Sequence, residues 1–130
     1  MLKTLGAAAA ILLFTVSAQA AGEMRCTSPD GMASIAMTLG SLPVLNVIGA
    51  RADIDGEVYA VADEEGATTV AVGQAAFTTG GLVVDFTDPN VEDILLSVRI
   101  ATATEGGEAA AAGVLTIPGT AAIAVTCEGP

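Results

Sequence analysis

The sequence predicts an all-β protein, either a small antiparallel β-barrel or a two-sheet sandwich of about eight strands. Two features of the chain after residue 20 predict this class. Gly, Thr, Val, Ile and Ala are frequent, and turn-forming residues separate short runs in which apolar and polar side chains alternate. No run requires a helical crossover, so we expect neighbouring strands to be mostly antiparallel.

In the first half of the chain, a strand over residues 24–27 is followed by the turn Ser28-Pro29-Asp30-Gly31. The next two runs alternate with the period of two that a half-buried strand requires. Within the second of them, Gly49 predicts a bulge or bend. The side chains expected on the apolar faces are Ile35, Met37 and Leu39 in the second strand and Ile48, Ala50, Ala52 and Ile54 in the third.

In the second half, residues 91–103 fit the spacing of both a helix and a strand, and we prefer the strand. Residues 105–108, Glu-Gly-Gly-Glu, predict a loop tip, and the alanine run 109–112 is too short to hold a helix alone. Phe77 and Phe86 are expected in the core. The side chains expected to face inward are Leu82, Val84 and Phe86, then Ile94, Leu96, Val98 and Ile100, and finally Ile123, Val125 and Cys127.

The N-terminal residues have the features of an export signal. Residues 1–20 contain one positive charge, Lys3, then an apolar run over 5–16 and the small-x-small pattern Ala18-Gln19-Ala20. The apolar run is shorter than the roughly 20 residues that a spanning helix needs, so we expect no membrane insertion. We therefore predict a bacterial signal peptide over 1–20 and a single all-β domain over 21–130. Its expected location is the periplasm, with secretion to the medium as the alternative.

Cys26 and Cys127 are the two cysteines of the chain, and they lie near the two ends of the mature domain. In an oxidising compartment two such cysteines usually pair. A bridge that closes a loop of about 100 residues stabilises the fold by up to about 4.7 kcal/mol in the loop-entropy treatment. It would place the first and last strands side by side and would therefore favour a barrel, which has no free edges.

The chain is strongly acidic, with a formal net charge of −11 at pH 7. Such a surface repels nucleic-acid phosphates and anionic membranes, so we expect no nucleic-acid partner. It suits a basic protein partner or cations. The simpler interpretation is that the charge keeps the protein soluble.

The chain lacks the side chains on which most catalysis depends. It has no histidine, and its single lysine lies in the predicted signal peptide. Histidine bases, histidine metal sites and Schiff-base chemistry are therefore excluded. The carboxylates of Asp85, Asp88, Glu92 and Asp93 flank one turn, and glycosidases use such pairs, but no tryptophan is present to form a sugar platform. We predict that the protein is not an enzyme and has no cofactor.

Residues 50–66, ARADIDGEVYAVADEEG, are the strongest candidate for a functional surface. Asp55-Gly56 between two alternating runs predicts a hairpin. A two-residue turn would pair Ile54 with Glu57 and place that glutamate on the apolar face. A three-residue loop over 55–57 would pair Ile54 with Val58 and keep the face apolar, so we prefer the longer loop.

In the preferred register Arg51, Asp53 and Tyr59 lie together on the outer face as an aromatic surrounded by charges, and they are our candidate partner-binding residues. The simpler interpretation is that Tyr59 covers the edge of the sheet. A second and weaker candidate is a calcium site formed by Asp53, Asp55 and Glu57, because Ca²⁺ prefers six to eight oxygen ligands.

The two ends of the chain are similar to the bacterial periplasmic inhibitors of c-type lysozyme. The segment Cys26-Thr27-Ser28-Pro29-Asp30-Gly31 places a cysteine just before a turn, and Cys127 corresponds to a second cysteine near the end. The inhibitory Ser-Gly-x-x-Tyr loop of that family is absent, since the chain contains no Ser-Gly pair. The resemblance implies a small disulfide-linked β-fold that binds a protein.

Three functions fit these features. The first is a non-enzymatic secreted or periplasmic binding or accessory protein that docks a basic protein partner. The second is a carrier of a small apolar ligand inside the barrel, for which alanines at inward positions would leave room. The third is an envelope structural subunit that self-assembles by strand pairing. The sequence leaves the oligomeric state open.

Overall fold

The computed structural model describes residues 22–130, so the predicted signal peptide over 1–20 lies outside the described residues. The described chain is all-β, as predicted, and its ten strands form a single sheet. In chain order the strands are β1 (Gly22–Thr27), β2 (Ala33–Leu39), β3 (Val47–Ile54), β4 (Glu57–Ala60), β5 (Thr68–Thr69), β6 (Ala71–Thr78), β7 (Gly81–Thr87), β8 (Ile94–Glu105), β9 (Glu108–Ile117) and β10 (Ala121–Glu128).

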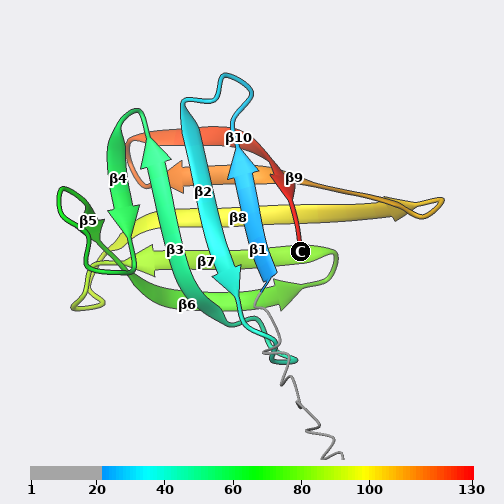
Figure 1. Ribbon diagram of the computed structural model, residues 1–130, viewed down its shortest axis with the longest axis horizontal. Helices are drawn as coiled ribbons and strands as arrows, with labels where there is room; N and C mark the ends of the chain where they lie inside the picture. The colour runs from blue at the N-terminus through cyan, green and yellow to red at the C-terminus, as the bar shows by residue number, and fades with distance from the viewer. Residues whose placement is uncertain (1–21) are drawn as a thin grey trace, which may run out of the picture.

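The sheet curls into a nearly closed barrel. The strand order is β5-β4-β3-β2-β1-β10-β9-β8-β7-β6, and every neighbouring pair is antiparallel except β4 with β5. In Figure 1 the strands β1–β4 run across the strands β6–β10, so one half of the sheet covers the other. Of the two predicted closures the structure therefore has the barrel-like one, and the barrel remains open between its end strands β5 and β6.

The core fills the space between the two halves of the sheet. Its largest fully buried side chains are Phe86, Ile35, Met37, Leu96, Leu115, Val84, Val98 and Cys26. The predicted inward faces of β2 and β7 are confirmed, because Ile35, Met37 and Leu39 and also Leu82, Val84 and Phe86 are buried. The strand preferred for the ambiguous segment 91–103 is also confirmed as β8.

Three apolar residues expected to face inward are exposed instead. One is Ile94, which is 46% exposed because the β7–β8 register shifts between Phe86 and Thr87 and turns Ile94 toward the outer face. Ile48 is 55% exposed because the β2–β3 register shifts between Thr38 and Leu39, which moves Ile48 to the outer face beside Gly49. The predicted irregularity at Gly49 is therefore real, and it reverses the predicted direction of Ile48. Phe77 is 57% exposed because it lies near the end of the edge strand β6, where no further strand covers it.

The predicted disulfide is present and joins the first and last strands. Cys26 and Cys127 are directly opposite each other in the β1–β10 pair, with their Cα atoms 4.0 Å apart. The bridge indicates an oxidising, extracytoplasmic compartment. Within residues 22–130, no helix is long and apolar enough to cross a membrane.

Candidate functional site

The acidic hairpin forms with the shorter of the two predicted turns. Asp55 and Gly56 both have positive φ angles, 53° and 86°, and the strands pair Ile54 with Glu57 and Ala52 with Tyr59. The three-residue loop that we preferred is therefore wrong. A two-residue turn of this kind matches the twist of the flanking strands. The glutamate costs little on the apolar face because Glu57 lies at the rim of the barrel, where it is exposed.

This register separates the predicted partner-binding residues. Tyr59 lies beside Ala52 and packs partly buried against the core, whereas Arg51 and Asp53 belong to the opposite face of β3. The prediction that all three share an outer face is wrong. The Nε of Arg51 donates to the carboxylate of Glu64 at 3.2 Å, so its charge is already paired.

Two of the three carboxylates of the calcium candidate make separate hydrogen bonds. An oxygen of Asp53 accepts the backbone N–H of Gly56 at 3.2 Å, and Glu57 accepts the hydroxyl of Tyr59 at 3.2 Å. Burial of the ring and the neighbouring Glu57 raise the pKa of Tyr59 above its usual value. Nowhere among residues 22–130 do three acidic or cysteine side chains gather in a group that could hold a metal ion.

The β1–β2 and β3–β4 turns are joined at one end of the barrel. The backbone N–H of Asp55 donates to the carbonyl of Met32 at 2.9 Å, and Asp30 accepts the hydroxyl of Ser28 at 2.6 Å. The hydrogen bond from Ser28 lowers the pKa of Asp30, and the N–H of Met32 contributes to this. Sequence reasoning missed Met32, which is 57% exposed at this end of the barrel.

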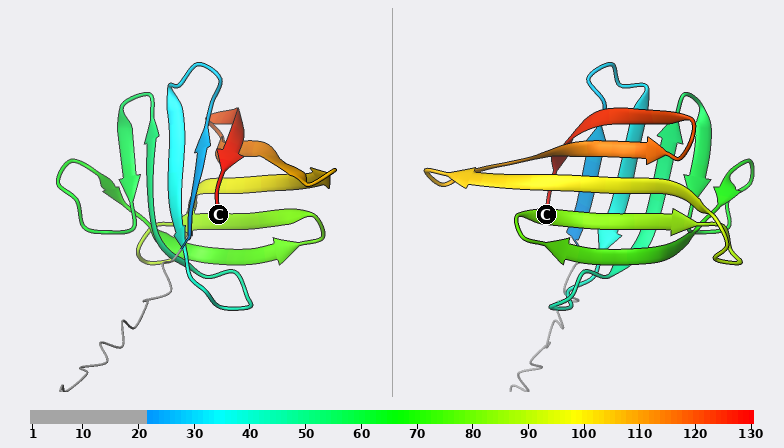
Figure 2. Two further views of the ribbon diagram at one scale, coloured as in Figure 1. Left: turned by 45° about the vertical axis from the view of Figure 1, so that its right-hand side comes forward. Right: turned by 180° about the vertical axis from the view of Figure 1, so that it is seen from behind.

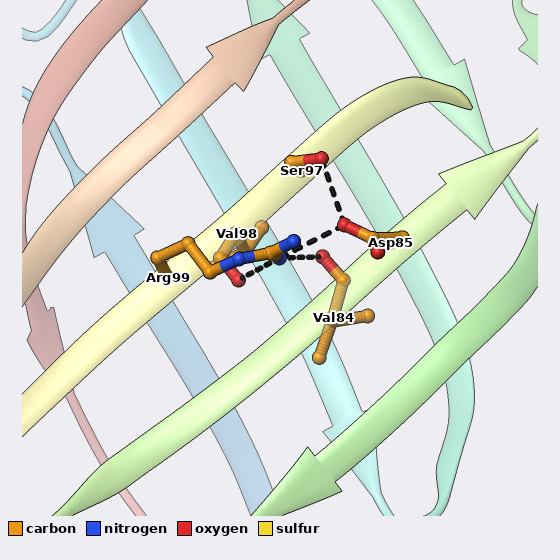
Figure 3. A network of polar contacts seen from close by, with 5 residues as sticks. All are labelled: Val84, Asp85, Ser97, Val98 and Arg99. Carbon is orange, nitrogen blue, oxygen red and sulfur yellow. Dashed lines mark hydrogen bonds and ion pairs between the residues drawn. The ribbon is translucent and has the colours of Figure 1, made fainter. Parts of the chain in front are cut away.

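An ion pair between a buried aspartate and a half-exposed arginine lies on the outer face of β7 and β8 (Figure 3). Asp85 accepts the hydroxyl of Ser97 at 2.7 Å and pairs with Arg99 at 2.8 Å through the same carboxylate oxygen. Arg99 also donates to the carbonyls of Val84 and Val98. Burial alone would raise the pKa of Asp85, but the hydrogen bonds from Arg99 and Ser97 and the charge of Arg99 outweigh it and lower the pKa.

The loop that follows β7 is ordered by a single carboxylate. Asp88 accepts the backbone N–H groups of Asp93 at 2.7 Å, Glu92 at 2.8 Å and Asn90 at 3.2 Å. These bonds, led by the one from Asp93, lower the pKa of Asp88. Val91 lies within this loop with a φ of 58°, an outlier for a β-branched residue. Asp85 and Asp88, two of the four carboxylates noted around this turn, are thus engaged within the chain.

The most prominent surface feature is a hairpin that extends beyond the barrel (Figures 1 and 2). The N–H of Thr102 still bonds to the carbonyl of Gly80 at 2.7 Å, and residues 103–110 continue as a two-stranded ribbon that we call the arm. Every residue from 101 to 110 is exposed. The predicted loop tip over 105–108 is therefore correct. The ribbon was not predicted, because its small side chains show no apolar periodicity.

Two hollows flank the base of the arm. A groove of about 360 Å³ runs along it, between the alanines of β9 and the C-terminal residues. An apolar pocket of about 290 Å³ lies at the adjoining mouth of the barrel. The two share Met24, Thr102 and Pro130, so they form one continuous surface. The exposed Phe77 forms part of the wall of the mouth pocket.

Comparison of the chain with protein families, with curated proteins and with solved structures finds no match. The candidate functions therefore depend on the fold and the surface alone. Chemically, the surface offers carboxylates in excess over cations, exposed apolar side chains at both ends of the barrel, and a projecting arm.

Proposed function

We propose that the protein is a non-enzymatic binding protein of the bacterial periplasm that docks a basic protein partner. The extracytoplasmic compartment follows from the disulfide, and the choice of the periplasm rests on the signal-like residues 1–20. The partner class rests on charge. The alternative location is the extracellular medium.

The observation that carries the proposal is that the protein neutralises each of its own arginines. Between residues 22 and 130 there are three arginines, and each forms an ion pair within the chain. These pairs are Arg25 with Glu23, Arg51 with Glu64 and Arg99 with Asp85. The chain has fifteen acidic residues, so most carboxylates face solvent without a compensating cation. Such a surface attracts basic proteins and accelerates their association.

Self-assembly is the second candidate, and the edge strand β6 favours it. β6 ends the sheet and carries no charged residue, and uncharged edge strands pair readily with other strands. The large side chains that fill the barrel, Phe86 and Met37 among them, give an apolar-ligand carrier less support.

The test is affinity capture by the oxidised domain, residues 21–130, immobilised and exposed to extracytoplasmic proteins of the native host. We expect a discrete basic protein that elutes as the salt concentration rises, because salt screens charge. The matched control is a chain of the same composition in scrambled order, which keeps every carboxylate but does not form the fold. Equal retention of the protein by the folded and unfolded chains would show that charge alone is responsible and would contradict the proposal.

A further inference from the structure

We propose that the arm, residues 103–110, together with the apolar mouth at its base, is the docking element, and that the arm inserts into a basic cleft of the partner. This inference rests on the proposed function and adds to it a place on the molecule and a mode of binding. Four properties of the arm and its surroundings support it, namely its shape, the charge of its tip, the surface at its base and the charge of the rest of the chain.

The shape of the arm suits insertion into a narrow cleft. Its stem contains only alanine and threonine, so the ribbon is little wider than its backbone. Gly106 and Gly107 have φ angles of 59° and 83° and form a two-residue turn between Glu105 and Glu108. Such a turn matches the strand twist and keeps the tip compact. A two-stranded hairpin in water is only marginally stable, so contact with a partner would also stabilise it.

The tip of the arm carries an uncompensated pair of like charges. Glu105 and Glu108 are direct cross-strand partners, and like charges in that position destabilise a hairpin. At the β1–β10 seam the corresponding cross-strand pair, Arg25 with Glu128, has opposite charges. A lysine or arginine of a partner that lies between the two glutamates would remove the repulsion. The tip is therefore expected to prefer a cationic cleft.

The base of the arm adds an apolar contact. Met24, Leu39, Phe77 and Leu82 line the mouth pocket, and the groove continues from it along the arm. Phe77 is more than half exposed, and exposed aromatic side chains are common anchors of protein interfaces. A cleft that received the arm would bring its rim against this pocket. The partner is thus expected to have an apolar rim around a basic cleft.

The charge of the chain argues against a second copy as the occupant. Each arginine among residues 22–130 is already paired, so another copy offers the tip no free cation from the described part of the chain. A second copy would instead bring further carboxylates toward Glu105 and Glu108. The arm of an identical chain would therefore be repelled, whereas a basic partner is attracted.

The experiment is an NMR titration of the ¹⁵N-labelled oxidised domain with a short blocked peptide, Lys-Leu-Lys-Thr-Lys. The control ligand has glutamine in place of lysine. We expect the lysine peptide alone to shift the amide signals of Gly106 and Gly107, together with those around Phe77. Shifts centred on the acidic loop between β4 and β5 would overturn the inference.

Two matched pairs of variants sharpen the experiment. Glu105→Gln with Glu108→Gln should weaken binding about five-fold, because exposed ion pairs each contribute little. Asp63→Asn with Glu65→Gln removes the same number of charges from the β4–β5 loop and should change affinity less than about two-fold. Phe77→Ala should also weaken binding, whereas Ile48→Ala, at a similarly exposed position on β3, should not.

The outcomes separate the inference from the proposed function. Equal losses in the two charge variants would show that the arm is not the docking element, and the preference for a basic partner would stand. No difference between the lysine and glutamine peptides would overturn both. Deletion of Thr104, Glu105, Glu108 and Ala109 shortens the arm and keeps its glycine turn. If the domain dimerises and this shortened form does not, the arm serves a second copy and the inference is wrong.

Discussion

Val91 has the least favourable backbone conformation among the described residues. Besides glycines, only Asp55 and Val91 have positive φ values between residues 22 and 130, at 53° and 58°. Aspartate tolerates this conformation, but the branched Cβ of valine does not. The side chain of Val91 is 64% exposed, so packing offsets little of the cost. The hydrogen bonds that Asp88 accepts from the same loop hold the conformation in place.

Val91→Gly is therefore expected to stabilise the protein. Relief of the strained backbone is worth about 1–2 kcal/mol, and the greater freedom of glycine in the unfolded chain costs part of it, about 0.4–1 kcal/mol. We expect the free energy of unfolding, measured by urea denaturation, to rise by about 0.5–1 kcal/mol. The control is Glu92→Gly in the same loop, where φ is not positive and the substitution should destabilise. A Val91→Gly variant less stable than the parent would show that the side chain makes a contact worth more than the strain.

The ion pair of Asp85 should make stability depend on pH in the acid range. Its pKa is lower in the folded protein than in the unfolded chain, so the unfolded chain binds the proton more tightly. The contribution of Asp85 is therefore complete above the unfolded pKa of about 3.9 and is lost as the pH falls toward the folded pKa. Asp30 and Asp88, whose pKa values are also lowered, act in the same direction.

Asp85→Asn should lower stability at neutral pH by about 1 kcal/mol, since it removes the charge that pairs with the half-exposed Arg99. Below about pH 4 the variant should also lose stability less steeply than the parent. Denaturation curves over a series of pH values measure both effects. Asp63→Asn, on an exposed loop, is the control. Parallel acid slopes for parent and Asp85→Asn would contradict this account of Asp85.

At the scale of the strands, the alternation of apolar and polar residues predicts which side chains face inward. It does not predict the direction of side chains near a β-bulge. Alternation gives the inward faces of β2 and β7 correctly, because the extra residues at the register shifts lie in the partner strands β3, β6 and β8 and not in β2 or β7. It fails for Ile48, since one extra residue in a strand reverses the direction of every side chain beyond it. The sequence pattern predicted an irregularity at Gly49, but it did not predict that this irregularity would turn Ile48 outward.

The candidate site was less predictable than the fold. The sequence predicted the acidic hairpin but not its register. The register depends on the free-energy cost of placing Glu57 on the inner face, and this cost is small only because Glu57 lies at the rim of the barrel. The arm could not be recognised from the sequence pattern, because both of its faces are exposed to water and its residues need not alternate between apolar and polar. Its acidic tip was predicted only as a loop. The arm is exposed and projects from the barrel because of how the whole sheet is assembled, so the sequence of the arm alone does not predict either property.

We expect position 113 on β9 to require a glycine, because β8 and β9 approach each other closely there. A Cβ at this position would overlap the carbonyl oxygen of Arg99 on β8. Gly113→Ala should therefore destabilise the protein by about 1–3 kcal/mol, as overpacking does. Gly49→Ala is the matched control, because its nearest neighbour would be Thr38 Oγ1 at 3.7 Å, an ordinary contact. Thermal unfolding of both variants measures the difference. Equal melting temperatures would show that β8 and β9 can separate at no cost.

At the scale of the whole molecule, one seam joins the two halves of the sheet. The strands β1–β4 are joined in series by their own turns, as are β6–β10, and β1 with β10 is the pair that connects the two series across the chain ends. That seam contains three residue pairs, Arg25 with Glu128, Cys26 with Cys127 and Thr27 with Thr126. The β8–β9 pair contains nine. The shortness of the seam explains why a covalent bond at its centre matters.

Replacement of both cysteines by alanine should open this seam first. The bridge spans 101 residues, and removal of a native disulfide from a small secreted domain typically costs about 2–5 kcal/mol. The free energy of unfolding of a small domain is about 5–15 kcal/mol, so the variant should remain folded but be only marginally stable. We expect urea denaturation to report this loss, and hydrogen exchange to show lost protection in β1 and β10 before β7 and β8. A loss below about 1 kcal/mol, with protection unchanged in β1, would mean that the two halves of the sheet hold together through the core they share. The disulfide would then be dispensable for holding the two halves of the sheet together, and packing between the halves would determine the shape of the barrel.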